Sequence, residues 1–434
     1  MLVESEDDEQ IIERVASLDI GKKEVVCCVR VPAAGGGRRR LQEVSTHSTM
    51  VGSLCQLADR LVDLGVERVV MEATSDYWRP PFYLFEAHGL VPWLVNAKDV
   101  KHLPGRPKTD KLDAVWLCKV AERQMLRPSF VPPFDVRQLR DLTRYRVDLI
   151  SVRTAEKNRV EKLLEDACIK LSSVASDIFG VSGRSMLAAL IDGETDPHVL
   201  AELARTRMRT KLRDLEEAFA GLRLGTFNAH HRFMLTTMLA RIDATTADIA
   251  TVEAEISQHL HAGPAQPAPF AEAVARLDAI PGVGPTTAAD IIAEIGLDMT
   301  RFPTPGHLAS WAGFAPTTKS SAGKTKGNAK TGHGDRYLAR ALGEAAVTAG
   351  CTKTYLGARH QRIAKRRGPR KAVVATGRVI LEIAWHLLAD PDAEFHDLGP
   401  DYHDRHLHHD RAKRNHIRQL EALGYHVTLA PTAA

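Results

Sequence analysis

Four acidic residues in the first third of the chain have the types and spacing of a metal-dependent phosphodiester site. Asp19 ends the apolar run Val-Ala-Ser-Leu, and Glu72 ends the run Val-Val-Met. Asp110 and Asp113 are three residues apart, so in a helix their Cβ atoms lie about 5–6 Å apart on one face. Converging carboxylates favour Mg²⁺ or Mn²⁺ over zinc. Two such ions about 3.5–4 Å apart stabilise the attacking and leaving oxygens of a phosphodiester.

Each of these acids also has a plainer explanation. An Asp at the end of a strand often begins a turn, and an acid in the first turn of a helix stabilises the helix dipole. For any one acid alone the plainer explanation is favoured. Their combination favours a shared site.

The elements that must position the acids alternate between strand-like and helix-like segments. We expect the first three strands to form an antiparallel meander within a mixed α/β sheet, with helices following. Ligands bind such sheets at the edge where strand ends gather. The predicted strands are 14–20, 24–31, 41–46, 68–71 and 90–95, and the predicted helices are 51–64 and 77–88.

A second candidate site is the turn Pro-Gly-Val-Gly-Pro at residues 281–285, which precedes an apolar helix. Gly282 and Gly284 would let the backbone approach a phosphate, while the N–H groups of the next helix point at it. This is the pattern of a nucleic-acid-binding helix-hairpin-helix. The alternative is a tight turn between helices that needs glycine for its geometry alone.

A third candidate is the Gly/Lys/Thr/Ser-rich segment between Gly313 and Asp335, expected to be a flexible basic loop presenting Ser320 and Ser321. Its Gly-Lys-Thr is not a nucleotide-binding loop, because Thr318 stands where that motif needs glycine. Nearby cations would help a serine to attack phosphorus. The alternative is a solvent-exposed linker. The cations are Lys319, Lys324, Lys326, Lys330 and Arg336.

Charge is unevenly distributed, although 58 Lys+Arg and 54 Asp+Glu leave a net charge of only +4. Residues 345–381 contain nine Lys or Arg and no acid, which suits a nucleic-acid backbone. The alternative is a solvated helix face. The central bases of this stretch are Arg366, Arg367, Arg370 and Lys371.

The rest of the composition indicates a globular protein of the cytoplasm. With 44% hydrophobic residues and no apolar run of ~18 residues, we expect no membrane span. The acidic N-terminus does not resemble a secretory signal, and the six cysteines contain no C-x-x-C pair, so we expect reduced thiols. We expect the four histidines between His403 and His409 to be solvated rather than to bind zinc.

Changes in pattern along the chain divide it into four regions. Two charged helical stretches near residues 136–176 and 230–260 have a spacing that predicts pairing, and a Pro/Ala-rich linker follows at 262–270. The predicted regions are an α/β domain (1–128), a helical or coiled-coil arm (129–265), an α-helical C-terminal domain (271–390) and a basic, His-rich tail (391–434).

Taken in order, the motifs resemble the DEDD-type insertion-sequence transposases, also called bridge-RNA-guided recombinases. The resemblance rests on Leu-Asp19, Met-Glu72-Ala-Thr, Lys-Thr-Asp110-Lys-Leu-Asp113, Pro-Gly-Val-Gly and the Ser320-Ser321-Ala-Gly-Lys segment. It covers nearly the whole chain. Two departures are Ala322 and Ser75, where the family pattern has glycine.

The resemblance implies a RuvC-like, RNase H-fold N-terminal domain whose four carboxylates hold Mg²⁺. It also implies a C-terminal domain whose serine forms a covalent phosphoserine link to DNA; this serine falls on Ser321, with Ser320 as the fallback. The implied partners are donor and target DNA, a noncoding bridge RNA and further copies of the chain, from dimer to tetramer. The implied location is the bacterial cytoplasm, with nucleoid association when DNA is bound.

Two other functions remain open from the sequence. One is a RuvC-like, structure-selective junction nuclease that uses metal and water only, and would not need either serine. The other is a non-catalytic nucleic-acid-binding protein whose acids are structural.

Overall fold

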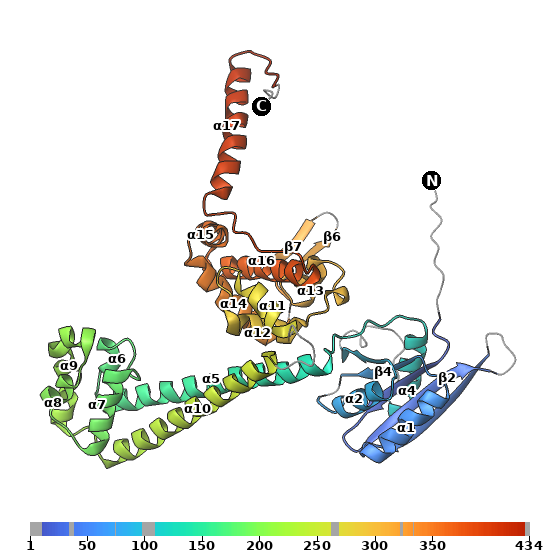
Figure 1. Cartoon of the computed structure of the whole chain (residues 1–434), viewed down its shortest axis with the longest axis horizontal. Helices are drawn as coiled ribbons and strands as arrows, with labels where there is room; N and C mark the ends of the chain where they lie inside the picture. Colours follow the sequence, from blue (N-terminus) through green and yellow to red (C-terminus); the bar gives the residue numbers. More distant parts are fainter. Residues whose placement is uncertain are drawn as a thin grey trace. The chain divides into compact units, whose positions relative to one another are not determined.

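The chain divides into two compact units, Met1–Val131 and Pro132–Ala434, in a computed structural model (Figure 1). The structure describes residues 11–33, 39–73, 75–97, 109–261, 269–321, 324–332 and 334–429. The side chains of 110, 317–330, 403, 404 and 406–412 are outside the description.

The first unit contains a five-stranded mixed sheet in the order β3-β2-β1-β4-β5. β1 runs antiparallel to β2, and β2 antiparallel to β3, which confirms the predicted meander. β4 lies parallel to β1 on its other side, and β5 lies parallel to β4. The strands are β1 (Val15–Ile20), β2 (Glu24–Pro32), β3 (Arg40–Ser48), β4 (Arg68–Glu72) and β5 (Pro92–Val95).

Helices cover both faces of this sheet. Alternation along β1 sends Leu18 into one core with α1 (Val51–Asp63) and α2 (Arg79–Ala87). Val15 enters the opposite core with α4 (Asp110–Glu122). Asp19 lies four residues after Val15 on β1 and therefore faces the same side of the sheet, the side that α4 covers.

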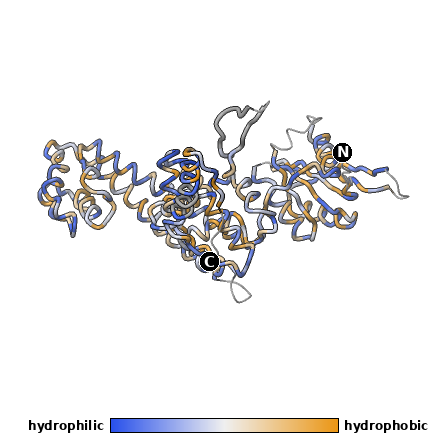
Figure 2. The backbone as a smooth tube through the Cα atoms, turned by 90° about the horizontal axis from the view of Figure 1, so that it is seen from above, coloured by the Kyte–Doolittle hydropathy of each residue, from blue (hydrophilic) through white to orange (hydrophobic). Residues whose placement is uncertain are grey.

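The second unit begins with the predicted helical arm. α5 (Phe134–Asp166) and α10 (Ala229–His261) pack against each other, which confirms the predicted pairing. The buried residues of α10 include Leu235, Met238, Leu239 and Ile242, at the spacing of a helix with one buried face. Hydrophobic and hydrophilic residues alternate along the helical parts of the chain (Figure 2).

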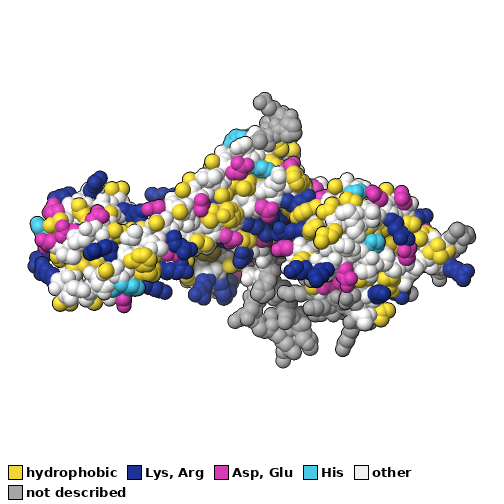
Figure 3. Space-filling view, turned by 90° about the horizontal axis from the view of Figure 1, so that it is seen from below, with side chains coloured by type: hydrophobic (Ala, Val, Ile, Leu, Met, Phe, Trp, Pro, Cys, Tyr) yellow, Lys and Arg dark blue, Asp and Glu magenta, His cyan; other side chains and the backbone are white. Residues whose placement is uncertain are grey.

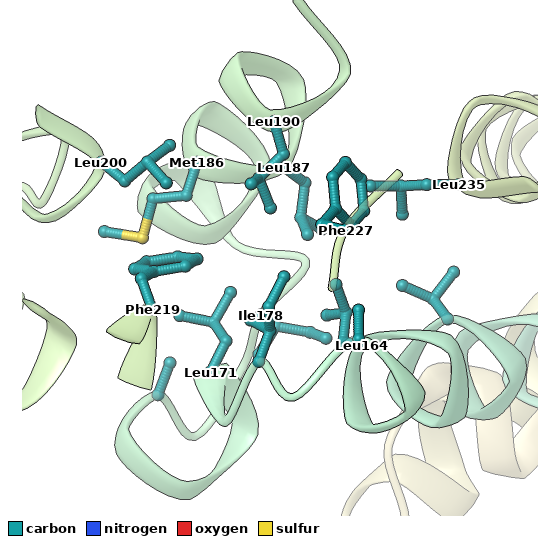
Figure 4. Packing of buried hydrophobic residues seen from close by; sticks show 14 of the residues in the cluster. Leu164, Leu171, Ile178, Met186, Leu187, Leu190, Leu200, Phe219, Phe227 and Leu235 are labelled. Atoms are coloured by element: carbon teal, nitrogen blue, oxygen red, sulfur yellow. The ribbon is translucent and has the colours of Figure 1, made fainter. Parts of the chain in front are cut away.

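A small helical bundle, which we call the head (residues 167–228), connects α5 to α10. Its core contains Leu171, Met186 and Phe219 together with Leu164 of α5 and Leu235 of α10 (Figure 4). Head and arm therefore share one core. The head elements are α6 (Leu171–Val174), α7 (Val181–Asp192), α8 (Pro197–Glu202), η1 (Thr206–Lys211), α9 (Leu212–Ala218) and η2 (Ala220–Leu224).

The C-terminal part is mainly helical, as predicted, with one correction. The segment expected to be a flexible loop is an antiparallel hairpin of β6 (Thr317–Ser321) and β7 (Lys324–Lys330), because its backbone groups pair, with a register shift between Thr317 and Lys319. The first helix also starts at Pro269, inside the predicted linker. The helices are α11 (Pro269–Asp278), α12 (Pro285–Ile295), η3 (Met299–Arg301), α13 (Pro305–Trp311), α14 (Arg336–Gly350), α15 (Tyr355–Arg367), α16 (Pro369–Ala389) and α17 (Tyr402–Ala422).

Among the described helices, α16 alone is long and apolar enough to cross a membrane. It packs against α13, α14 and α15, and Thr376, Ile380 and Ala384 are fully buried along it. We therefore interpret α16 as the central core helix of the C-terminal part.

Candidate functional site

The strand register places Asp19 beside Glu72. β1 and β4 are parallel, with Leu18 paired to Met71, and Asp19 and Glu72 are the next residue on each strand. Neighbouring strands lie about 4.8 Å apart, so the two acidic positions are adjacent at the same end of the sheet. Both residues are half-buried.

Both acids belong to the sheet face that α4 covers. Val15 and Val70 lie in the core beneath α4, and Asp19 and Glu72 follow them with the period of two that a strand imposes. The sequence-predicted acids of the two strands are thus on the same face as the helix that carries the other two.

A buried hydrogen bond fixes the first turns of α4 to β1. Ser17 Oγ donates to the carbonyl oxygen of Ala114 at 2.6 Å, and Ser17 lies two positions before Asp19. Asp113, which is half-buried, directly precedes Ala114. Asp110 opens α4 one turn earlier, and its side chain is outside the described part.

The structure therefore gathers the three described acids on adjacent elements of one face. Within the described side chains, which exclude that of Asp110, no three His, Cys, Asp or Glu residues form a metal-ligating group. Asp19, Glu72 and Asp113 therefore lie on neighbouring elements but do not by themselves form a metal-ligating group.

The backbone after Glu72 is strained at Ser75, whose φ is +48°. This left-handed conformation favours glycine, and the family pattern has glycine there.

Ser320 and Ser321 are the last two residues of β6. In the ladder, Ser320 pairs with Thr325 and Ser321 pairs with Lys324, next to the turn of the hairpin. The same two strands carry the four predicted lysines, at 319, 324, 326 and 330.

The base of this hairpin is closed by two glycines. Gly313 has a φ of +78°, and a Cβ on Gly334 would lie 2.0 Å from the carbonyl oxygen of Ala312. The backbone before the hairpin thus contacts the backbone after it. Asp335 then caps α14, accepting hydrogen bonds from the N–H groups of Tyr337 and Leu338 at 2.7 and 3.0 Å.

A buried charge network, not predicted from the sequence, connects α5 to α12 and to this cap. Arg144 donates to both carboxylate oxygens of Glu294 at 2.8 and 2.7 Å, and to Asp335 Oδ2 at 2.6 Å. Arg140 donates to the carbonyl oxygens of Ala293 and Glu294 at 2.9 and 2.7 Å. The signal in the sequence was a lone Glu294 inside the apolar Ile-Ile-Ala-Glu-Ile stretch.

Beside the network, Asp290 and Arg146 line a cavity of about 160 Å³. Arg146 Nη2 lies 2.7 Å from Asp290 Oδ2, yet burial outweighs this cation and raises the pKa of Asp290 to about 6. Within the described residues, Asp290 Oδ1 and Arg146 Nε are buried without a hydrogen-bond partner.

A turn joins α11 to α12 where the sequence predicts a helix-hairpin-helix, and packing explains one of the two glycines in this turn. A Cβ on Gly282 would lie 2.4 Å from the carbonyl oxygen of Ala345 and 2.6 Å from the nitrogen of Ala349, both in α14. Gly282 is therefore required for contact with α14. A Cβ on Gly284 would meet no heavy atom of the described residues within 4 Å, so these residues leave space for a ligand there.

The basic positions have different surroundings. Arg366, Arg367, Arg370 and Lys371 are exposed around the junction of α15 and α16. Arg336 is also exposed, but its guanidinium lies 3.7 Å from Asp148 and donates to the hydroxyl of Tyr337. Of the His-rich tail, only the backbone helix α17 is described over residues 406–409.

Comparison with known proteins gives two family matches in chain order. Residues 16–169 match a family model described as "Transposase", and residues 274–361 match one described as "Transposase IS116/IS110/IS902 family". The two matches together span more than half of the chain, and they contain all four acids, both serines and both turn glycines.

Curated relatives come from insertion elements. The chain is 28% identical over 271 residues to the IS110 uncharacterized 43.6 kDa protein of Streptomyces coelicolor, covering 58% of this chain and 63% of that relative. It is 28% identical over 402 residues to the IS900 uncharacterized 42 kDa protein of Mycobacterium paratuberculosis, covering 86% and 95%. A third relative, from the IS116 element of Streptomyces clavuligerus, is 25% identical over 321 residues, covering 71% and 78%.

An acidic sheet edge beneath α4, a basic hairpin carrying two serines, and two family matches spanning both regions lead to one conclusion: the chain belongs to the IS116/IS110/IS902 family of transposases.

Proposed function

We propose that the protein cuts and rejoins DNA, using carboxylates of the N-terminal unit and a serine of the β6–β7 hairpin. The observation that carries the proposal is the register of β1 and β4, which puts Asp19 next to Glu72 on the face that α4 covers. The strand order, three antiparallel strands followed by two parallel ones, supports an RNase H-like, RuvC-like fold for this unit.

The donor set suits a divalent cation with hard ligands. Asp19, Glu72, Asp110 and Asp113 would hold Mg²⁺, or Mn²⁺, because carboxylate oxygens are the ligands these ions prefer. When bound, the metal would polarise the scissile phosphate and stabilise the departing oxygen. Asp19 and Glu72 are half-buried, and the hydrogen bond of Ser17 holds α4 against β1. Both features would keep the metal ligands in fixed positions.

Ser321 is the nucleophile of the covalent step, with Ser320 as the alternative. The serine oxygen attacks phosphorus and forms a phosphoserine ester, while the bond from phosphorus to the deoxyribose oxygen breaks and that oxygen takes up a proton. Attack by a deoxyribose hydroxyl on the ester reverses the step and releases the serine. Each exchange replaces one phosphodiester by another, so no ATP is required.

The hairpin provides the positive charge that such a step needs. Its two strands hold Lys319, Lys324, Lys326 and Lys330 in the same ribbon as the serines, where phosphate charge develops. Exposed Arg366, Arg367, Arg370 and Lys371, together with the open position at Gly284, would contact DNA backbones.

We extend the proposal to the partners that the family pattern implies. These are donor and target DNA, a noncoding bridge RNA that selects both by base pairing, and further copies of the chain, from dimer to tetramer. The location is the bacterial cytoplasm, on the nucleoid when DNA is bound.

A melting-temperature titration with MgCl₂ tests the metal site without relying on activity. We expect Mg²⁺ to stabilise the wild type, because a ligand that binds only the folded state raises its stability. The shift should be lost in Asp19→Asn and Glu72→Gln, and kept in Asp63→Asn, which changes an exposed acid of α1. An undiminished shift in Asp19→Asn and Glu72→Gln would remove both acids from the site.

A cleavage assay separates the transposase from the junction nuclease. A nuclease that uses metal and water cuts normally in the double variant Ser320→Ala/Ser321→Ala, whereas the proposed transposase does not. Normal hydrolysis of branched DNA by this variant would therefore favour the nuclease.

A further inference from the structure

The head at the end of the arm carries a dense basic segment that neither family match includes. The matches end at residue 169 and resume at 274. Between them, residues 205–213 contain five bases and no acid, and we call these nine residues the head basic segment. Its bases are Arg205, Arg207, Arg209, Lys211 and Arg213.

All five basic side chains are exposed, because the apolar residues between them anchor the segment. Met208 and Leu212 pack against the core of the head, while the five bases lie at alternate positions along η1 and into α9. Lys and Arg side chains are visible at this end of the second unit, among Asp, Glu and hydrophobic side chains (Figure 3, left). Met208 and Leu212 therefore hold the segment against the head core while the five bases remain in solvent.

Within the described part of the chain, the side chains of three of the five bases make no hydrogen bond or ion pair: Arg205, Arg207 and Arg213. Arg209 donates to Glu202 at 3.0 Å, and Lys211 Nζ donates to the carbonyl oxygen of Val174 at 2.8 Å. The nearest acid on the other side, Asp214, lies in the first turn of α9, where it stabilises the helix dipole. Neighbouring like charges whose side chains are unpaired repel one another, and a polyanion relieves that repulsion.

The backbone of the segment is held in place. The N–H of Arg205 donates to Ser182 Oγ at 2.9 Å, and Ser182 is buried in α7. Thr206 adopts a φ of +48°, an uncommon conformation for a residue with a β-branched side chain. The guanidinium groups thus project from a fixed backbone rather than from a loose loop.

We propose that the head basic segment is a binding site for the phosphate backbone of duplex DNA. The nine residues contain no aromatic side chain on which an unpaired base could stack, so a double helix suits them better than a single strand. This choice of DNA rests on the proposed function, but not on the carboxylates or the serine.

The length of the arm sets the distance between the head basic segment and the base of the arm. From Arg144, where α5 joins the charge network, to Asp166 at its end, α5 rises about 33 Å. One turn of B-DNA covers a similar length of about 34–36 Å. The head therefore contacts DNA about one helical turn away from the base of the arm.

Salt dependence of DNA binding by the full chain tests the site. The probe is a 30-bp duplex of arbitrary sequence, and the variant is Arg205→Gln/Arg207→Gln/Arg213→Gln. Loss of three phosphate contacts should lower the slope of log K against log salt by about 2.7, which weakens binding roughly 100- to 1,000-fold at 0.1 M salt. Arg→Lys at the same three positions should keep the slope, and footprints of the Gln variant should shorten by about ten base pairs.

A matched control removes three other exposed charges of the arm and head, by Lys162→Gln/Arg223→Gln/Arg241→Gln. An equal loss in both triple variants, or none in the first, would overturn the proposal. A loss seen only with duplex RNA would assign the segment to RNA and overturn it as well. If the triple variant fails to fold, the single change Arg207→Gln should lower the slope by about 0.9.

This test is independent of catalysis. Loss of covalent attachment in a serine variant should leave the binding slope unchanged, and loss of the head basic segment should leave the Mg²⁺-dependent melting shift unchanged.

Discussion

Ser17 and Ala114, 97 positions apart in sequence, are joined by a hydrogen bond of 2.6 Å that is buried between β1 and α4. The bond fixes the turn of α4 that carries Asp113 against β1, the strand that carries Asp19 next to its end. The position of the acids of the helix relative to those of the sheet depends on this contact.

We expect Ser17→Ala to lower the free energy of unfolding by about 1–2 kcal/mol, because a buried hydrogen bond is lost. The Mg²⁺-dependent rise in melting temperature should also weaken, since α4 is less firmly held. Urea unfolding with and without MgCl₂ measures both effects. Ser151→Ala is the control, because its hydroxyl makes only a local helical bond to the carbonyl oxygen of Val147. Equal stability of the two variants would argue against this role for Ser17.

Ser75→Gly should stabilise the protein by about 1–2 kcal/mol, because glycine adopts the φ of +48° without the cost that a Cβ imposes. Thermal and urea unfolding measure the gain. The control Ser53→Gly, inside α1, should destabilise by about 1 kcal/mol instead. A loss of stability in Ser75→Gly would show that the hydroxyl of Ser75 makes contacts that outweigh its strain.

Much of the N-terminal unit could be predicted from sequence, because its strands are short runs of β-branched residues with turns between them. The end of each run then marked Asp19 and Glu72. Their adjacency, however, depends on the register of β1 and β4, a contact between segments fifty residues apart that no local pattern contains. The hairpin was missed because Gly, Lys and Ser are weak strand formers, and its strands depend on pairing with each other.

The charge network was missed for a different reason. In sequence, Arg140 and Arg144 look like members of a solvated helix face, since dense charges usually are. Only their burial against Glu294 distinguishes Arg140 and Arg144 from the solvated bases of an ordinary charged helix face. The short helices of the head are stabilised by a core that they share with α5 and α10. No single segment contains this core, so the sequence of one head helix does not reveal it.

Gly334→Ala should destabilise the base of the hairpin by more than about 2 kcal/mol, because the new Cβ would lie 2.0 Å from the carbonyl oxygen of Ala312. Thermal unfolding should reveal the loss, and protease cleavage near the hairpin should be faster. Gly332→Ala is a close control, since its Cβ would only make ordinary contact, 3.7 Å from the Cα of Gly313. Similar behaviour of the two variants would mean that the glycine contact does not close the hairpin.

The pH dependence of stability should reveal the buried Asp290. Burial raises its pKa from 3.8 to about 6, so the folded state holds this proton more tightly than the unfolded state. The stability contributed by Asp290 is therefore complete below about pH 4 and is lost as the pH rises to about 6, by up to roughly 3 kcal/mol.

Comparison with Asp290→Asn isolates this contribution from the other acids. The free energy of unfolding of the wild type minus that of the variant should fall between pH 4 and 6 and stay constant above pH 7. A difference that rises with pH would mean that the ion pair with Arg146, at 2.7 Å, outweighs desolvation.

The central claim is that a hairpin serine becomes joined to DNA at a site that the carboxylates complete. The most direct measurement is a denaturing gel of protein incubated with Mg²⁺, labelled DNA containing the element's ends, and the noncoding transcript beside the reading frame. We predict a covalent protein–DNA band for the wild type that is absent in Ser321→Ala and in Asp19→Asn, although Ser321→Ala still binds DNA. A band of undiminished intensity in Ser320→Ala/Ser321→Ala would contradict the account.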